Sequence, residues 1–380
     1  MSKIKVCHFS SVHHVWDTRV FYRECVSLAN DFDVTLIAIG SGTSTLNGVR
    51  VIGIPKPANF FIRFFYTVFK VFIEAVKQDA EIYHIHDAEM IPFGITLSIL
   101  GKKVIYDIHE NTFDDILLKP WVNKSFRLLI ANCYNLLLFS GARFLHYIVV
   151  VADPKYLTKF FVSENECTII QNFANTDELN EFAVTDRGSL EGNHIFYVGM
   201  IRDMYYNIDP VLNAMYLLKQ KGINCHLHLI GYFGSKTDHS LASVACYPQI
   251  KDQITFYGFL DIKSAYKIAM KCKIGLCIKD QPVQMLVSHE RKLFEYMAIG
   301  LPSIFCNTSI YTALNNQWNI GLGVNLKDSQ EIANALAQLL NHSDLINALS
   351  NNNLQASQRH YNWQNEATKL IELYKKLIIA

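Results

Sequence analysis

The segment from residue 288 to residue 302 holds the charged side chains best suited to chemistry. It reads Ser-His-Glu-Arg-Lys-Leu-Phe-Glu-Tyr-Met-Ala-Ile-Gly-Leu-Pro, which predicts a loop, a helix that ends at the glycine, and a buried strand. The free N–H groups and positive dipole end of a helix N-terminus suit a phosphate, and Arg291 and Lys292 would add charge there. One turn later, the carboxylate of Glu295 could accept hydrogen bonds from sugar hydroxyls. The alternative is an amphipathic helix with a charged surface face.

Two other stretches combine aromatic with basic residues. Phe60 to Val76 contains six phenylalanines, and Arg63, Lys70 and Lys77 recur at a seven-residue spacing that keeps them on one helical face. Such a stripe suits the interface of an anionic membrane. Trp121 to Phe139 is a second stretch of this kind. Ordinary packing of both helices on a sheet would explain the same patterns.

The elements that must position these residues repeat one unit in the first half of the chain. A short, apolar, β-branched run is followed by a turn and a longer stretch with helical period. Because the runs are continuously apolar, they predict strands of a parallel sheet that is covered by helices on both faces. The predicted strands are Ile4–Phe9, Val34–Ile39, Val49–Ile54, Ile82–Ile85, Val104–Ile108 and Tyr147–Val151.

The same alternation restarts after a polar stretch, which predicts a second Rossmann-like domain. Its strands are predicted at Ile195–Val198, Cys225–Ile230, Ile254–Tyr257, Ile274–Ile278 and Pro302–Cys306, with a last helix from Asn365 onward. The expected division is a first domain over 1–175, an exposed linker over 176–193, a second domain over 194–360, and a C-terminal helix over 361–380 that packs back on the first domain. Ligands of two such domains bind at the carboxyl ends of the strands, in the cleft between them.

Composition limits the possible partners. The 380 residues carry 35 Lys and Arg against 34 Asp and Glu, so the chain lacks the basic field that sequence-independent binding of nucleic acid requires. Half of the residues are hydrophobic and 18% are charged, which excludes a disordered chain and leaves apolar residues that could face lipid. The nine cysteines include no C-x-x-C pair, a pattern typical of reduced thiols in a cytosolic protein.

The N-terminal residues and the apolar runs predict a location inside the cell. Met1 to Phe9 leads directly into a strand pattern, without the apolar stretch and cleavage site of a signal peptide. No run reaches the about 18 apolar residues of a transmembrane helix. We expect a cytoplasmic protein that is peripheral to the inner face of the plasma membrane.

The segment from Lys292 to Pro302 resembles the donor-site motif of the family 4 glycosyltransferases, which have the two-domain GT-B fold. Further matches occur in the order typical of the family, and the first is similar to its bacterial surface-polysaccharide branch. These matches are Asp17–Glu24, His86–Glu89, Asp107–Glu110, Ile169–Asn172, Tyr197–Gly199, Leu229–Gly231, Ile254–Gly258 and Tyr361–Trp363. Their order and spacing extend the resemblance over nearly the whole chain.

The resemblance implies roles for individual residues. It places His109 at the donor sugar and Glu295 at the ribose as catalytic residues, with Asp17 and Arg19 on the acceptor side. A histidine at a strand end is otherwise often structural. The donor-binding residues that it implies are Arg202, Gly231, Glu290, Arg291, Lys292 and Glu295.

The chain departs from the family pattern at two positions of the donor site. The family usually has a pair of glutamates spaced E-x7-E, but Val287 stands eight positions before Glu295. Glu290 is the candidate to replace the missing carboxylate. The basic residue expected after the Val-Gly strand is also displaced, and Arg202 is the candidate for it.

Two patterns raise the question of a metal ion. His84 and His86 lie on one face of a predicted strand and Asp87 follows, which is typical of metal ligands. A third or fourth ligand cannot be located in the sequence, and enzymes of the resembled family generally need no metal, so we expect no metal and no cofactor. The D-x-D pattern at Asp31-Phe-Asp33 precedes a buried strand and predicts a turn.

These observations together predict a retaining glycosyltransferase that moves a sugar from a nucleoside diphosphate sugar to a glycan acceptor. The implied acceptor is lipid-linked, and the implied pathway is bacterial polysaccharide or lipopolysaccharide synthesis. A sugar-nucleotide 2-epimerase of the same fold is one alternative. A non-catalytic partner subunit that has lost part of the donor site is the other, and Val287 is its main support.

Overall fold

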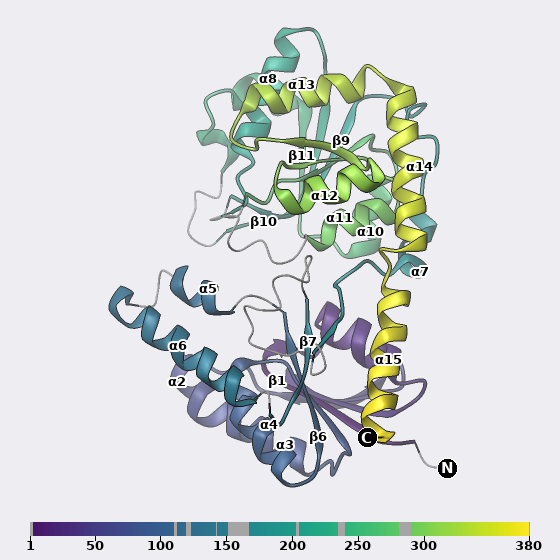
Figure 1. Ribbon diagram of the computed structural model, residues 1–380. Coiled ribbons are helices and arrows are strands. Elements are labelled where there is room, and N and C mark those ends of the chain that lie inside the picture. Colours follow the sequence, from purple (N-terminus) through teal and green to yellow (C-terminus); the bar gives the residue numbers. More distant parts are fainter. Residues whose placement is uncertain are drawn as a thin grey trace. The chain divides into compact units, whose positions relative to one another are not determined.

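The computed structural model describes residues 3–109, 112–118, 123–141, 143–150, 167–202, 205–234, 240–280 and 290–379. The chain forms two compact units (Figure 1). The first unit combines residues 1–172 with residues 363–380, and the second comprises residues 173–362. Each unit contains a sheet of mainly parallel strands with helices, as the sequence predicts.

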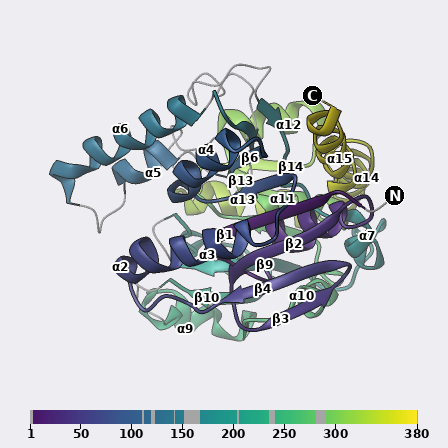
Figure 2. The ribbon, with the colours of Figure 1, turned by 90° about the horizontal axis from the view of Figure 1, so that it is seen from below.

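The sheet of the first unit has the strand order β3-β4-β2-β1-β5-β6-β7-β8, and Figure 2 shows β1 to β4 side by side. Its strands are β1 (Lys5–His14), β2 (Asp33–Ile39), β3 (Thr43–Leu46), β4 (Val49–Ile54), β5 (Ile82–Ile85), β6 (Lys103–Ile108), β7 (His146–Val149) and β8 (Cys167–Ile169). All neighbours are parallel except β3 and β4. Strand order changes direction at β1, which places the carboxyl ends of β1 and β5 at a topological switch point.

Helices cover both faces of this sheet. Within the described residues, the helices of the first unit are η1 (Thr18–Cys25), α1 (Val26–Leu28), α2 (Phe60–Ile62), η2 (Arg63–Thr67), α3 (Val68–Val76), η3 (Ala88–Met90), α4 (Ile91–Ile99), α5 (Thr112–Leu118), α6 (Lys124–Gly141) and α15 (Trp363–Ile379). Apolar side chains of α3, α4 and α6 pack on one face, and those of η1, α1 and α15 pack on the other. The continuously apolar strands are explained by this burial on both sides.

The C-terminal helix α15 belongs to the first unit, which confirms the prediction that it packs back on the first domain. Leu370, Leu373 and Tyr374 recur at helical spacing and are buried against η1 and α1. The indole N–H of Trp363 donates to the hydroxyl of Ser27 at 2.9 Å. Residues from both ends of the sequence therefore share one core.

The second unit has a six-stranded parallel sheet of order β11-β10-β9-β12-β13-β14. Its strands are β9 (His194–Ile201), β10 (His226–Phe233), β11 (Ile254–Gly258), β12 (Ile274–Cys277), β13 (Ser303–Cys306) and β14 (Gly321–Val324). Its helices are α7 (Thr176–Leu179), α8 (Asp209–Gln220), α9 (Tyr247–Ile250), α10 (Ile262–Ala269), α11 (Arg291–Ala298), α12 (Ser309–Trp318), α13 (Ser329–Leu340) and α14 (Ser343–Arg359). One hydrophobic core joins the sheet to these helices.

Three strands lack the apolar pattern that predicts the others. β3 is exposed at all four positions and forms an antiparallel edge, and β8 and β14 are short edge strands. Edge strands with polar or glycine-rich sequences carry no continuous apolar run, so the sequence pattern misses them. Asp31 lies in a turn before β2, as predicted for the D-x-D segment.

Residues 176–193 are not the exposed linker that the polar composition predicts, because they are part of the second unit. Arg187 in this segment is fully buried. Its guanidinium donates hydrogen bonds to the carbonyls of Ala269, Cys272, Ile299 and Gly300. Four carbonyl acceptors compensate for removing this charge from water, and they fix the segment to the unit.

Candidate functional site

Helix α11 carries the charged residues of the predicted phosphate site. Glu290 takes the N-cap position with an extended backbone, and its N–H donates to the hydroxyl of Tyr311 at 3.1 Å. At the other end, Gly300 adopts a φ of +67°, and a Cβ there would approach the carbonyl oxygen of Val184 to 2.7 Å. Glycine therefore ends the helix and lets the chain turn into β13. The preceding residues 281–289, which include Val287, lie outside the described part of the chain.

Lys292 is the central cation of this site. Its ammonium nitrogen lies 3.4 Å from Oε1 of Glu290, and 4.6 and 5.0 Å from the ring centroids of Tyr197 and Tyr206. Within the described part of the chain, this buried nitrogen has no hydrogen-bond acceptor. Burial lowers the pKa of Lys292, but the nearby Glu290 carboxylate and tyrosines outweigh it and hold the pKa well above its ordinary value. Lys292 is therefore a permanent positive charge with unused donors, as anion binding requires.

Glu290 is buried beside this ammonium group. Both oxygens of its carboxylate lack hydrogen-bond donors within the described residues. The structure therefore brings the predicted replacement for the missing glutamate to Lys292, with acceptors that a sugar hydroxyl could use.

Two glycines on neighbouring strands, one of them beside Lys292, stand where a larger residue would collide with its surroundings. Gly199 on β9 and Gly231 on β10 are register partners with φ values of +143° and +135°. A Cβ on Gly199 would lie 2.8 Å from Nζ of Lys292, and a Cβ on Gly231 would lie 1.8 Å from the carbonyl oxygen of Gly199. The close approach of the two backbones therefore excludes a side chain at Gly231.

Replacing Gly231 by alanine should lower the free energy of unfolding by about 2 to 4 kcal/mol, because a strained φ and a backbone collision act together. Gly222, at a φ of +78° with open space around its Cβ position, is the matched control. Gly222→Ala should cost only the conformational strain, about 1 kcal/mol. Urea unfolding of both variants measures the difference, and equal losses would show that the contact with Gly199 is not rigid.

The carboxylate of Glu295 is held by two protein groups. The hydroxyl of Tyr266 donates to Oε2 at 2.7 Å, and the guanidinium of Arg291 pairs with Oε1 at 3.0 Å. Arg291 is therefore turned along α11 toward Glu295. Among the predicted donor-binding residues, two ion pairs thus form at the start of α11, Lys292 with Glu290 and Arg291 with Glu295.

Arg202 is bound elsewhere in the second unit. Its guanidinium donates to both carboxylate oxygens of Asp209, at 2.7 and 2.8 Å, and to the carbonyl of Ser240 at 2.6 Å. Its backbone has a φ of +49°. These contacts tie the end of β9 to α8, and they favour a structural role for Arg202 over the predicted phosphate contact.

In the first unit, His109 follows the carboxyl end of β6. Its Nε2 lies 2.9 Å from Oδ2 of the buried Asp107, and 3.4 Å from Nδ1 of His86. Burial raises the pKa of Asp107, but Arg19 and His109 outweigh it and hold that pKa well below its ordinary value. The side chain of His109 is 19% exposed, so it is fixed from one side and accessible from the other.

The two residues predicted on the acceptor side have structural contacts. The Asp17 carboxylate caps η1 by accepting from the N–H groups of Arg19 and Val20 at 2.8 and 2.9 Å. The guanidinium of Arg19 is buried, and it donates to both oxygens of Asp107 at 3.0 and 3.1 Å. The burial and the partners of Arg19 favour a structural role over the predicted contact with an acceptor, whereas Asp17 remains partly exposed.

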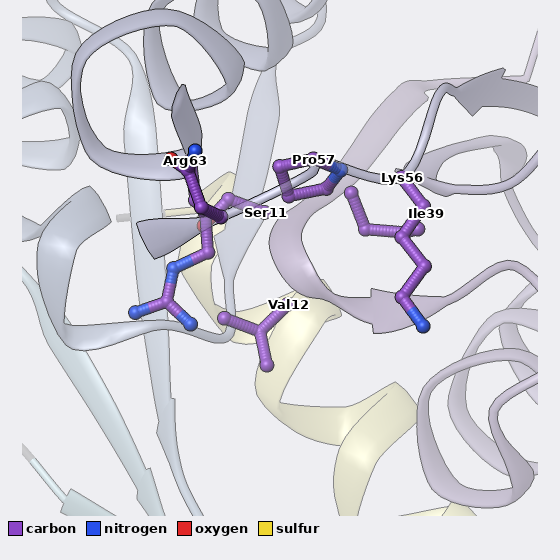
Figure 3. Close-up of a pocket in the computed structure, with 7 residues that line it drawn as sticks. Ser11, Val12, Ile39, Lys56, Pro57 and Arg63 are labelled. Carbon is purple, nitrogen blue, oxygen red and sulfur yellow. The ribbon is translucent and has the colours of Figure 1, made fainter. Parts of the chain in front are cut away.

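A pocket of about 300 Å³ opens at the carboxyl ends of β1 and β2 (Figure 3). Ser11, Lys56, Asn59 and Arg63 contribute polar groups to its lining. Arg63 also pairs with Glu89 at 3.3 Å. The pocket presents two basic side chains at the sheet edge where ligands of this fold class bind. The sequence does not reveal it, because Ser11 lies on β1, Lys56 and Asn59 follow β4, and Arg63 lies on η2.

The aromatic surroundings of Lys292 and the pairing of Arg19 with Asp107 are features of the candidate site that the sequence pattern missed. Tyr206 follows β9 in a stretch of sequence without a motif, so no signal marks it. Arg19 and Asp107 are 88 positions apart. Both stand inside motifs that the sequence singled out, but only the sheet order brings them together.

A comparison of the sequence with protein families finds a match in the part of the chain that holds α11. Residues 192–342, within the second unit, match the sequence profile of the family described as Glycosyl transferases group 1. No curated protein sequence matches the chain. The matched segment contains Gly199, Gly231, Lys292 and Glu295.

Solved structures match over nearly the whole chain. Sucrose-phosphate synthase from Thermosynechococcus elongatus has a TM-score of 0.75 at 16% identity, covering 99% of this chain and 100% of the other. HepE of Anabaena in complex with UDP has a TM-score of 0.69 at 13% identity, covering 98% and 100%. WaaG, a glycosyltransferase involved in lipopolysaccharide biosynthesis, has a TM-score of 0.69 at 12% identity, covering 97% and 98%. These likenesses show a shared fold, and they confirm the predicted GT-B architecture.

Proposed function

We propose that this chain is a retaining glycosyltransferase that moves a sugar from a nucleoside diphosphate sugar to a lipid-linked glycan acceptor in bacterial polysaccharide or lipopolysaccharide synthesis. The observation that carries the proposal is the buried ammonium group of Lys292, which has no hydrogen-bond acceptor among the described residues and lies at the N-terminus of α11. A diphosphate supplies the acceptors that this group lacks. The profile match over residues 192–342 supports the proposal, and so does the bound UDP of the Anabaena protein.

In this proposal, the second unit binds the donor. Lys292 and the N–H groups at the start of α11 bind the diphosphate, and the absence of a side chain at Gly199 leaves space for the Lys292 ammonium group. Glu295 is assigned to the ribose, because a carboxylate accepts hydrogen bonds from sugar hydroxyls and Tyr266 and Arg291 hold this one in a fixed position. Glu290 accepts from a hydroxyl of the donor sugar.

Catalysis then depends on stabilising the leaving group. Negative charge grows on the departing diphosphate as the glycosidic bond breaks, and Lys292 with the helix dipole opposes it. His109, oriented by Asp107, contributes to the transfer step as a donor toward the sugar or its phosphate. No metal ion is required for these roles.

The acceptor in this proposal binds to the first unit. Lys56 and Arg63 in the pocket at the ends of β1 and β2 suit a phosphate or an acidic sugar, as a lipid-linked glycan would offer. This pocket replaces the predicted contact of Arg19 with the acceptor.

Exposed aromatic side chains support a peripheral membrane role. In α2, η2 and α3, Phe61 is 71% exposed, Phe65 67% and Phe69 51%, so packing on the sheet does not explain them. In α6, the exposed apolar residues are Phe126, Leu128, Leu129, Ile130, Leu136 and Phe139. Among the described residues, each helix is too short or too polar to cross a bilayer. These faces suit insertion into the membrane interface.

Neutralising Lys70 and Lys77 should weaken binding to vesicles that contain anionic lipid. Each lysine near the surface contributes about 1 kcal/mol, so Lys70→Gln with Lys77→Gln should reduce partitioning about thirty-fold. Arg63 is left unchanged because it pairs with Glu89 and lines the pocket. Vesicle flotation measures the effect.

Replacing Phe61 and Phe65 by serine should also release the protein, whereas Phe259→Ser should not. Phe259 is 80% exposed but lies in the second unit, which makes it a matched control for lost apolar surface. Partitioning that is unchanged in all variants, or absent in the wild type, would contradict the membrane role.

Turnover of a panel of nucleoside diphosphate sugars tests the proposed reaction itself. A glycosyltransferase should release nucleoside diphosphate from one donor, and faster with the acceptor. If the diphosphate sugar stays intact but its configuration at C2 is inverted, the protein is the epimerase instead. If the protein acts on no donor, it is the non-catalytic subunit.

A further inference from the structure

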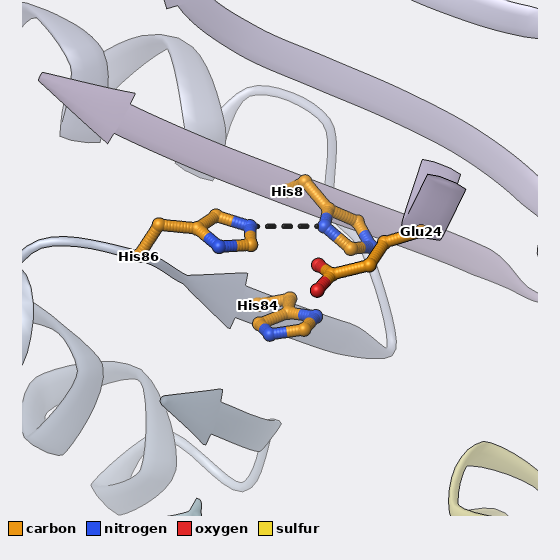
Figure 4. A group of neighbouring side chains, drawn as sticks. All are labelled: His8, Glu24, His84 and His86. Atoms are coloured by element: carbon orange, nitrogen blue, oxygen red, sulfur yellow. Dashed lines mark hydrogen bonds between the residues drawn. The ribbon is translucent and has the colours of Figure 1, made fainter. Parts of the chain in front are cut away.

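Three buried histidines and a buried glutamate meet in the core of the first unit (Figure 4). His8 lies on β1, His84 on β5, His86 directly after β5, and Glu24 on η1. Each offers one ligand atom, and these atoms all lie within 4.8 Å of one another. All four residues are at most 5% exposed. These polar side chains are therefore not part of a surface exposed to water.

Groups outside the cluster contact one nitrogen of each imidazole, as is typical of metal-binding histidines. The hydroxyl of Tyr374 on α15 contacts Nε2 of His8 at 3.0 Å and Nδ1 of His84 at 2.8 Å. Nδ1 of His86 faces Oδ2 of Asp107 at 3.8 Å. Each ring thus has one nitrogen toward an outer partner and the other directed at the cluster. Outer hydrogen bonds of this kind fix the tautomer and the ring direction in metal sites.

The atoms that face inward are short of partners. Nε2 of His84 and both carboxylate oxygens of Glu24 make no hydrogen bond within the described residues. Nδ1 of His8 and Nε2 of His86 form a hydrogen bond with each other at 3.1 Å. This separation is close to the about 3.3 Å between two nitrogens that share a tetrahedral zinc ion at 2.0–2.1 Å. Buried polar atoms without partners are rare, so the cluster has the features of a site built for a ligand.

The charges of the surroundings are compatible with a cation. Glu24 and Asp107 are both buried, and Arg19 lies against both, with Nε 2.9 Å from Glu24 and 3.0 Å from Asp107. Arg19 forms hydrogen bonds to both oxygens of Asp107, so its charge is already matched there. Glu24 and Asp107 therefore share the single positive charge of Arg19, and two buried carboxylates beside one guanidinium are compatible with a further cation.

We propose that His8, Glu24, His84 and His86 form a structural site for a divalent zinc-type metal ion. Three imidazole nitrogens and one carboxylate oxygen suit zinc, and they do not suit magnesium or calcium. The sequence suggested His84, His86 and Asp87 but gave no further ligand. The structure supplies His8 and Glu24, whereas Asp87 accepts hydrogen bonds from Ser10 and Ser11 and is not in the cluster.

The site joins elements that are distant in sequence. It connects β1, β5 and η1 directly, and through Tyr374 it connects them to α15 near the C-terminus. All four protein ligands would be used and the site is closed to solvent, so the metal acts on stability and enters as the unit folds. The inference is independent of the proposed sugar transfer.

Metal analysis of the full chain tests the proposal. Protein produced with zinc in the medium and dialysed against a weak chelator should retain about one equivalent per chain. The cobalt-loaded protein should show the intense visible bands of a tetrahedral site, and X-ray absorption of the zinc form should show only N and O ligands at about 2.0–2.1 Å. These wild-type measurements do not depend on whether any variant folds.

Variants locate the bound metal. His84→Gln and Glu24→Gln should lower the retained zinc to below about a tenth of an equivalent. His228→Gln is the matched control, because His194, His226 and His228 form a more exposed imidazole cluster in the second unit, with Nδ1 of His194 3.0 Å from Nε2 of His228. It should leave the zinc content unchanged.

Two results would overturn the proposal. One is wild-type protein without bound zinc whose melting temperature does not rise with added zinc or cobalt. The other is zinc that is lost in His228→Gln and kept in His84→Gln, which identifies adventitious binding to the exposed cluster. Neither result depends on glycosyl transfer, so it leaves the proposed function unaffected.

Discussion

Lys292→Ala should bind the cognate nucleoside diphosphate about five to 150 times more weakly than the wild type. The loss corresponds to about 1 to 3 kcal/mol for a charge-assisted contact with a phosphate in a buried setting. The ammonium group keeps its proton at any working pH, because Glu290 and the surrounding tyrosines hold its pKa above the ordinary value. Calorimetry with UDP and GDP measures the loss.

The controls for this prediction address charge and stability separately. Lys263→Ala removes a lysine of the same unit that is 74% exposed and should bind nucleotide normally. Lys292→Arg keeps the charge beside Glu290 and should retain part of the affinity if the fold accommodates it. Wild-type affinity in folded Lys292→Ala would remove Lys292 from the donor site.

His109→Ala should lower kcat about 10- to 1000-fold, while nucleotide affinity changes little. An imidazole that acts mainly in the transition state affects kcat, and the nucleotide is bound by groups of the other unit. Asp107 keeps both hydrogen bonds from Arg19 in this variant, so its buried charge stays compensated. Single-turnover transfer and a thermal melt on the same sample measure the two quantities.

A packing role for His109 predicts the opposite result, a lower melting temperature with normal kcat of the folded enzyme. His146→Ala is the matched control, since this partly buried histidine begins β7 and lies at the amino end of a parallel strand. It should affect stability and leave kcat unchanged. A fully active but less stable His109→Ala enzyme would end the catalytic assignment.

The apolar runs were sufficient to predict the parallel core of both sheets. Val49–Ile54 and Ile82–Ile85 have the predicted limits, because both strands are mostly apolar and β5 is buried at all four positions. The antiparallel strand β3 was not predictable in this way, since its side chains are exposed. The burial of Arg187 was not predictable either, because it depends on four carbonyl acceptors from distant segments of the chain.

The candidate site was predictable where one motif holds its residues together. Glu290, Lys292 and Glu295 lie within two turns of one helix start, so their shared location follows from local structure. The roles of Arg19 and Arg202 were not predictable, because their partners Asp107 and Asp209 compete with a ligand for the guanidinium. A motif indicates which residues are near a site, but only the fold shows which of their donors are already used.

The most direct test of the central claim is an NMR measurement of the full chain with its cognate nucleoside diphosphate sugar and a lipid-linked acceptor. We predict that the anomeric signal of the donor disappears as nucleoside diphosphate is released, and that the new glycosidic bond has the configuration of the donor. The same reaction should be strongly slowed in Lys292→Ala. A spectrum in which every donor stays intact, or in which only its 2-epimer forms with the diphosphate still attached, would contradict the claim.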